Sequence, residues 1–343
     1  MVGVNAAIWS HPWDLVDEGP AKAANRLAAL GIDEVNLATT MHSVQTLNPH
    51  NPERKTFFAD ASEYFQPDWD RYGEITPDVN ETMGEDDWLA EIAAGFEGTP
   101  VDLNSWGATF HSSRQGQRHP DATLTSPFGD SLVFGLCPSN PAVQEFGIEM
   151  TGDLADRDIF ETIEMELADY QYGTGYGWHH QEFFTELGPL GEFLFGLCFC
   201  EHCRANAAEA GVDVGAARES ARDALNARFE GGLAADTDVG GWLAEHPTVR
   251  EYADVRQETL AALVPLALFG LSAYLYFVRH MDLRDSVLIW TFWGLISLGL
   301  ARAGPATPIY DEPLDRKRMA VGVLTFALGV LCFTPVPFEL LSV

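Results

Sequence analysis

The sequence predicts an α/β protein with four parallel strands, followed by an all-α tail of two to three helices. In residues 1–170, strand-type and helix-type segments alternate in the order β-α-β-α-β-α-β, which is typical of a parallel sheet with right-handed crossovers. From residue 259 onward, long apolar segments replace this alternation. We therefore expect two domains, an acidic soluble domain at 1–258 and a helical transmembrane tail at 259–343.

The individual elements follow from local patterns. Proline near the start and glycine near the end mark helix boundaries, as Pro20, Gly31 and Pro141 do here. A polar excursion at 44–83, rich in Pro, Asn and Asp, is expected to be a loop over one face. The other expected elements are strands at 2–10, 33–43, 101–113 and 158–170 and helices at 20–32, 84–96, 140–157, 216–229 and 248–263.

Side chains suited to binding follow the predicted strand ends. The first three strands end at His11, His42 and His111, and the fourth ends at Glu166, with His179 and His180 after it. The carboxyl ends of parallel strands meet at one edge of a sheet, so we expect these residues to share one substrate pocket. The alternative for each single histidine is a loop or core position in which a backbone carbonyl accepts its hydrogen bond.

The fourth strand adds two carboxylates to this edge. With a period of two, Glu164 and Glu166 share a face with Thr162, whereas Ile163 and Met165 point toward covering helices. Two glutamates on one face can divide the roles of general acid and of base or nucleophile. The same pattern also suits a plain polar interior without catalysis.

A cysteine cluster follows in LCFCEHCR, residues 197–204. The thiolates of Cys198, Cys200 and Cys203 are suitable ligands for zinc or iron, and His202 is a candidate fourth ligand. Cys137 and the pair His179 and His180 are the other candidates for that position. The alternative is a set of reduced thiols that only fill space. A disulfide framework is not expected, because we place this domain in the reducing cytoplasm.

The charge distribution limits the partners of the first domain. Residues 1–258 carry 45 acidic and 14 basic side chains, a net charge of -31, whereas residues 259–343 carry six of each. Such an excess of acid argues against nucleic acid or anionic lipid as a partner of the first domain.

The tail has three charge-free segments, at 260–278, 286–301 and 319–338. Their length and their flanking aromatic residues predict two or three membrane spans, with lipid contact through residues 260–338. The placement of arginine and lysine between the segments, together with an N-terminus without a secretory signal, predicts a membrane protein whose first domain is cytoplasmic. A buried helical core is the alternative.

The first domain contains the motifs IWSHPWDL (8–15), TFHSS (109–113), RHPDA (118–122), LCPSNPAVQEF (136–146), IEMELADY with GWHHQEF (163–183) and GPLGEFLFGLCFCEHCR (188–204). Together these motifs resemble uncharacterised proteins regarded as glycosyl hydrolases with a TIM-barrel fold. The resemblance implies a carbohydrate-like small-molecule substrate and places Glu166 where related barrels carry the acid/base on the fourth strand. It further implies that the strand-end histidines hold sugar hydroxyls or a metal.

Four β/α units cannot close an eight-stranded barrel. The sequence therefore predicts an incomplete (βα)4 TIM-barrel-like sheet, a glycosyl-hydrolase-like fragment anchored to a membrane, with weak or no independent catalysis. A homo-oligomer is one way in which such a sheet would gain its missing strands.

The tail resembles the last membrane segments of archaeal site-2 zinc proteases, especially in PLDRKR and LCFTPVPF within residues 282–338. That family holds zinc with a His-Glu-x-x-His helix, and this motif is absent from the sequence. Two alternative functions follow: a C-terminal fragment of such a protease, and a structural membrane protein that holds zinc with its cysteine cluster.

Overall fold

The computed structural model describes residues 5–170 and 186–277. The chain divides into two units, Met1–Ala253 and Asp254–Val343, and the account below concerns the first unit. Helix α10 (Pro247–Phe277) ends the described part of the chain. The predicted domain boundary at residue 258 stays a prediction.

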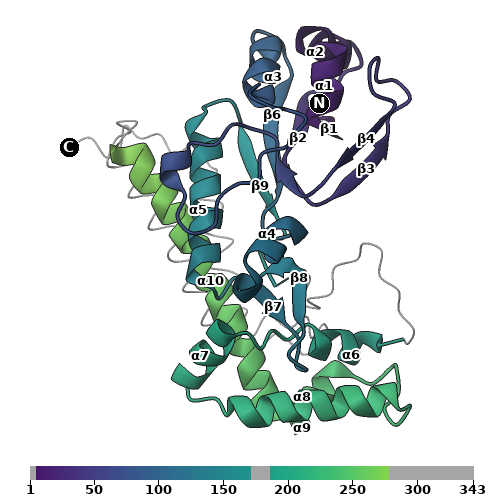
Figure 1. Ribbon diagram of the computed structural model, residues 1–343, viewed down its shortest axis with the longest axis vertical. Helices are drawn as coiled ribbons and strands as arrows, with labels where there is room; N and C mark the ends of the chain where they lie inside the picture. Colours follow the sequence, from purple (N-terminus) through teal and green to yellow (C-terminus); the bar gives the residue numbers. More distant parts are fainter. Residues whose placement is uncertain (1–4, 171–185, 278–343) are drawn as a thin grey trace, which may run out of the picture. The chain divides into compact units, whose positions relative to one another are not determined.

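A parallel sheet is the centre of the first unit, which confirms the predicted α/β class (Figure 1). Its strands lie in the order β1-β2-β6-β9, and each is parallel to its neighbour. The short strand β5 (Ser62–Glu63) adds to β2 in the antiparallel direction. The four parallel strands are β1 (Ala7–Ser10), β2 (Glu34–Met41), β6 (Asp102–Ala108) and β9 (Thr162–Glu166).

The helices between the strands begin where the sequence provides caps. Asp87 accepts hydrogen bonds from the backbone N–H groups of Leu89 and Ala90, and Asn140 accepts one from that of Ala142. Proline occupies the first turn of α1, α2 and α5. The prediction missed α1 but identified the other three. These helices are α1 (Pro12–Glu18), α2 (Pro20–Ala29), α3 (Trp88–Phe96) and α5 (Pro141–Asp156).

The prediction of a simple loop at 44–83 is wrong. This segment forms the hairpin of β3 (Val44–Leu47) and β4 (Thr56–Ala59), then β5 and a 3₁₀ turn, η1 (Trp69–Arg71). Alternate residues of β4 are buried, and the ring of Phe57 stacks on that of Trp13 at 4.1 Å between centroids. Burial of this face explains why a polar segment is ordered. The core cluster here consists of Trp13, Ala38, Met41, Phe57, Ala59, Tyr64, Met83 and Trp88.

A second hairpin follows β6, and the segments that carry the cysteines lie beside it (Figure 1). Gly116 lets α4 pack against β8, because a Cβ atom at this position would lie 1.7 Å from the backbone oxygen of Val133. The elements are α4 (Ser113–Arg118), η2 (Pro120–Ala122), β7 (Thr123–Thr125), β8 (Ser131–Leu136), α6 (Gly188–Phe195), α7 (Glu201–Glu209), α8 (Val214–Phe229) and α9 (Val239–Glu245). The predicted helix at 216–229 is confirmed as α8.

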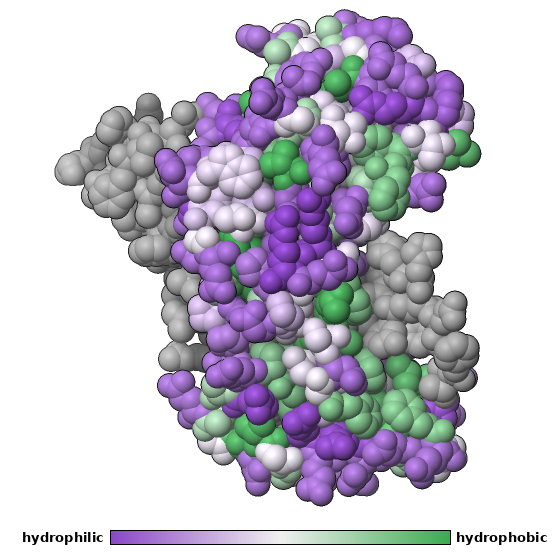
Figure 2. All heavy atoms as spheres, viewed as in Figure 1, coloured by the Kyte–Doolittle hydropathy of each residue, from purple (hydrophilic) through white to green (hydrophobic). Residues whose placement is uncertain are grey.

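The predicted membrane tail gains no support. Residues 286–301 and 319–338 lie outside the described residues. Within the described part of the chain, no helix combines the length and the apolar character that crossing a bilayer requires. On the visible face of the molecule, hydrophilic residues predominate and hydrophobic ones form separate patches, as the acidic composition of the first domain predicts (Figure 2).

Candidate functional site

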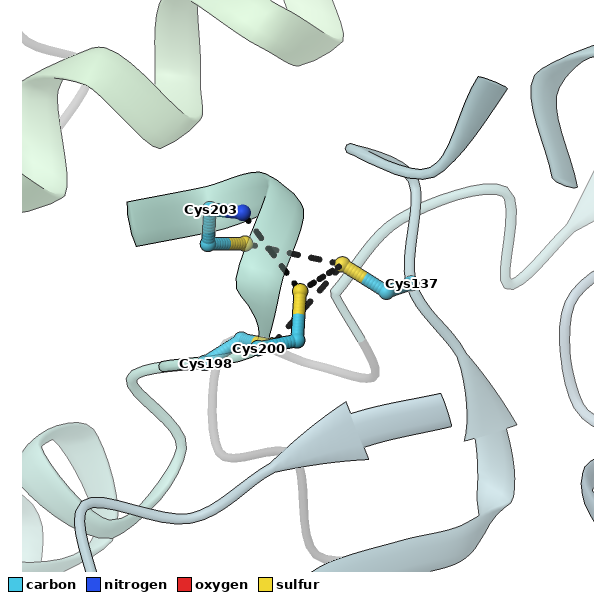
Figure 3. Close-up of side chains that lie close together, drawn as sticks. All are labelled: Cys137, Cys198, Cys200 and Cys203. Atoms are coloured by element: carbon cyan, nitrogen blue, oxygen red, sulfur yellow. Dashed lines mark hydrogen bonds between the residues drawn. The ribbon is translucent and has the colours of Figure 1, made fainter. Parts of the chain in front are cut away.

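Four cysteines from two separate segments meet in the interior of the first unit (Figure 3). Cys137 follows β8, Cys198 and Cys200 lie between α6 and α7, and Cys203 is in the first turn of α7. Each of these side chains is at most 5% exposed. Their four Sγ atoms all lie within 4.8 Å of one another, so one small ion can contact all of them.

The sulfur distances fit ligands of a tetrahedral metal site. The Sγ atom of Cys137 lies 3.5 Å from those of Cys200 and Cys203 and 3.8 Å from that of Cys198. Ligands at a metal–sulfur distance of about 2.3 Å would be about 3.8 Å apart in a regular tetrahedron. A disulfide bond would need about 2.05 Å. The cysteines are therefore reduced and spaced as metal thiolates are.

Backbone N–H groups favour negative charge on these sulfurs. The N–H of Thr125 donates to Sγ of Cys198 at 3.3 Å, and that of Cys203 donates to Sγ of Cys200 at 3.4 Å. Cys200 also caps the N-terminus of α7, where the helix dipole favours a thiolate. Hydrogen bonds with the other three thiols, first with Cys137, lower the pKa of Cys200. Burial raises the pKa of Cys137 and of Cys198.

Apolar and polar contacts hold the segment that carries the cysteines in place. The Phe199 N–H donates to the backbone oxygen of Thr125 at 2.8 Å. The Tyr252 hydroxyl donates to the backbone oxygen of Cys198 at 2.7 Å, and its ring stacks on Phe199 at 4.4 Å between centroids. The sulfurs are thus held close together by the fold itself.

The cluster answers the question that the sequence left open about a fourth ligand. Cys137, one of the three candidates, joins Cys198, Cys200 and Cys203. His202 is a partly exposed residue of α7 and is not one of the four. His179 and His180 lie outside the described residues.

The strand-end histidines come together as the topology predicts. His11 directly follows β1, His42 directly follows β2, and His111 lies three residues beyond β6. The rings of His42 and His111 are 5.1 Å apart between centroids. The ring of His11 stacks on Trp13 at 4.3 Å and lies 6.2 Å from that of Trp106.

His11 is held in its neutral form. Burial, and to a smaller extent the nearby His42, lowers the pKa of His11 to about 4. Its Nδ1 atom is buried and has no hydrogen-bond partner among the described residues. A neutral imidazole can accept a hydrogen bond from a ligand hydroxyl.

The two glutamates lie on one face of β9, as the period of two predicts. Glu166 accepts a hydrogen bond of 2.5 Å from the indole Nε1–H of Trp106, the strand neighbour of Glu164. The sulfur of Met165 instead contacts Thr151 of α5 at 3.4 Å, so the other face meets a helix. The same face as Glu166 carries Asn104, which donates to Asn36 and Glu34.

A pocket of about 460 Å³ opens beside the edge strand β9, and its lining includes Met165 as well as the two glutamates. Its volume lies within the usual range for small-molecule sites. Trp9, which is 59% exposed, and Trp106 place two indole rings beside the carboxylates. The sequence analysis missed both tryptophans, although the strand register places each of them on the same face of the sheet as Glu164 and Glu166. The lining residues are Trp9, Trp106, Glu164, Met165 and Glu166.

Comparisons with known proteins give little beyond this geometry. No protein-family model matches the chain, and no curated protein matches it. The chain is similar to a solved β-galactosidase from the psychrophilic Marinomonas ef1, with 12% identity and a TM-score of 0.40. The match covers 80% of this chain and 35% of that one, so the chain spans about a third of its length. A similarity this distant supports no conclusion about activity.

Proposed function

We propose that Cys137, Cys198, Cys200 and Cys203 hold a structural zinc ion. The observation that carries this proposal is the convergence of four buried sulfurs within 4.8 Å. Four protein thiolates fill a tetrahedral shell and leave no position for substrate, which is typical of structural rather than catalytic zinc. The ion would join the end of β8 to the segment between α6 and α7, two parts of the chain that are far apart in sequence.

Metal analysis of the purified chain tests this proposal. We expect about one zinc per chain, because a complete thiolate site binds zinc tightly at neutral pH. Substitution of zinc by cobalt should give the charge-transfer and visible bands of a tetrahedral thiolate site, and Cys200→Ser should weaken or remove them. His202→Ala is the matched control and should leave both results unchanged. A stoichiometry near zero in the unchanged protein would eliminate the zinc centre.

We further propose that the strand-end site belongs to half of a TIM-barrel-like fold and binds a carbohydrate-like small molecule. Four parallel strands in chain order with helices between them support the half-barrel. Indole rings beside carboxylates suit a sugar, because its apolar face stacks on an aromatic ring while its hydroxyls donate to oxygens. In this proposal Glu166 is the acid/base, and Glu164 lies beside it on the same face of β9.

Trp106 lines the pocket, whereas the three strand-end histidines lie outside its lining. Their proposed roles follow from their chemistry. His11, His42 and His111 would hold sugar hydroxyls, and Trp106 would orient the carboxylate of Glu166. Glycoside hydrolysis ordinarily needs two carboxylates on opposite sides of the scissile bond. Both glutamates of this site come from the same strand, so binding is proposed with weak or no independent catalysis. Completion of the barrel by a second copy and membrane attachment stay predictions from the sequence.

Replacing Glu166 tests the strand-end site. Glu166→Gln should weaken sugar binding and abolish any hydrolysis of aryl glycosides, because the amide cannot exchange the proton that the carboxyl group does. Tryptophan fluorescence during a galactose titration and release of the aryl group are the two measurements. Glu161→Gln, an exposed glutamate just before β9, is the control. Hydrolysis that survives Glu166→Gln at full rate would refute the assignment of the acid/base.

A further inference from the structure

A buried chain of hydroxyl groups leads from the cysteine cluster toward β9. The Sγ atom of Cys203 lies 3.3 Å from Oγ of Ser139, and that oxygen lies 2.7 Å from the hydroxyl of Tyr170. Ser139 is 5% exposed and Tyr170 is 2% exposed. The contacts are therefore shielded from water, in which they would weaken.

A bound metal would fix the direction of both hydrogen bonds. A free thiol at Cys203 can donate to Ser139, and either hydroxyl of the Ser139–Tyr170 pair can then be the donor. A metal-bound sulfur has no proton to donate, so Ser139 must donate to it. The single proton of Ser139 is then used, and Tyr170 must donate to Ser139. The loaded state thus allows a single orientation of the Tyr170 hydroxyl, whereas the metal-free state allows two.

Tyr170 lies close to the proposed acid/base along the chain, only four residues after Glu166. The connection is short and constrained. Leu167 follows β9 directly with a φ of 59°, a left-handed conformation that is rare for a residue of this type. Leu167 is buried, and the backbone oxygen of Glu166 accepts a hydrogen bond of 2.8 Å from the N–H of Thr109. This short, ordered connection links the backbone position of Tyr170 to that of Glu166.

We propose that metal loading of the cysteine cluster positions the Glu166 carboxylate through Ser139 and Tyr170. Both are positioning residues, since neither contacts the pocket over β9. The inference rests on the zinc centre proposed above and is independent of the proposed carbohydrate chemistry. It gives the metal a second role besides joining two segments, because the strand end would adopt its pocket geometry only in the loaded protein.

The indole N–H of Trp106 offers a direct readout, because it donates to Glu166. The chain has nine tryptophans, so a ¹H–¹⁵N spectrum of the full chain shows few indole signals. The indole signal that is missing from the spectrum of Trp106→Phe is assigned to Trp106. We expect this signal to shift when a chelator removes zinc from the loaded protein. In Tyr170→Phe and Ser139→Ala it should shift although zinc stays bound.

Tyr72→Phe is the matched control, since it removes a different buried tyrosine hydroxyl, one that donates to Asp153. The Trp106 signal should be unchanged in this variant. Bound zinc together with an unmoved Trp106 signal in both Tyr170→Phe and Ser139→Ala would overturn the relay and leave the zinc centre intact. Absence of zinc from the unchanged protein would overturn the zinc centre and, with it, the relay.

Discussion

Replacing Cys137 with serine should remove the metal and lower the free energy of unfolding of the first unit by about 4 kcal/mol. Cys137 is the only one of the four proposed ligands that comes from the β7–β8 segment. Its loss would leave three thiolates on one segment and no metal–thiolate bond to the other. The affinity of a structural zinc for its folded site is lost on unfolding, so it adds directly to stability.

Urea denaturation with parallel zinc analysis measures this effect. A strong chelator should destabilise the unchanged protein about as much as Cys137→Ser does, and it should have no further effect on the variant. Cys332→Ser removes the fifth cysteine of the sequence without altering the proposed ligands, and it should behave like the unchanged protein. Both proteins are compared in buffer that contains zinc. Equal free energies of unfolding for Cys137→Ser and the unchanged protein would show that these sulfurs only fill space.

The cysteine cluster illustrates what local spacing can and cannot predict. Three of its members lie within six residues, and their spacing alone suggested a metal site. The place of Cys137 depends on how the β7–β8 hairpin packs against the segment after α6, and no local pattern encodes that packing. The sequence could therefore offer Cys137 only as one candidate beside His202, which is adjacent in sequence but not part of the cluster.

The sheet was more predictable than its surroundings. Periodicity and the parallel-strand rule placed His11, His42, His111 and Glu166 at neighbouring strand ends, and the ring contacts of the histidines agree with that placement. The β3–β4 hairpin was missed because its order comes from burial of Phe57 against Trp13, a contact between distant residues. Trp106 was missed for a related reason, since its significance comes from its hydrogen bond to Glu166.

Replacing Glu63 with glutamine should raise the free energy of unfolding by about 3 kcal/mol at pH 9 and have little effect at pH 5. Glu63 lies in β5, is 3% exposed, and accepts a hydrogen bond from the backbone N–H of Asp78. Burial, followed by the charge of Asp78, raises the pKa of Glu63 to about 8. Arg114 and Arg118 pair with Asp78, and the charge of Arg114 offsets only a small part of the rise in the pKa of Glu63.

The sign of the pH dependence follows from proton binding. Between the ordinary glutamate pKa of 4.5 and a folded pKa of about 8, the folded protein keeps a proton that the unfolded chain has released. Stability therefore falls as the pH rises through this window and loses no more above it. Glutamine keeps the shape of the protonated carboxyl group and cannot ionise, so the fall attributable to this position should disappear.

Urea denaturation of both proteins at intervals from pH 5 to pH 9 tests this prediction. The difference between the two curves of unfolding free energy against pH gives the contribution of Glu63, because every other titrating group is common to both proteins. Glu91→Gln removes an exposed carboxylate on α3 and should give a curve parallel to that of the unchanged protein. If the Glu63→Gln curve is parallel as well, Glu63 is already ionised in the folded state at neutral pH, and the β5 segment tolerates a buried charge that its surroundings should oppose.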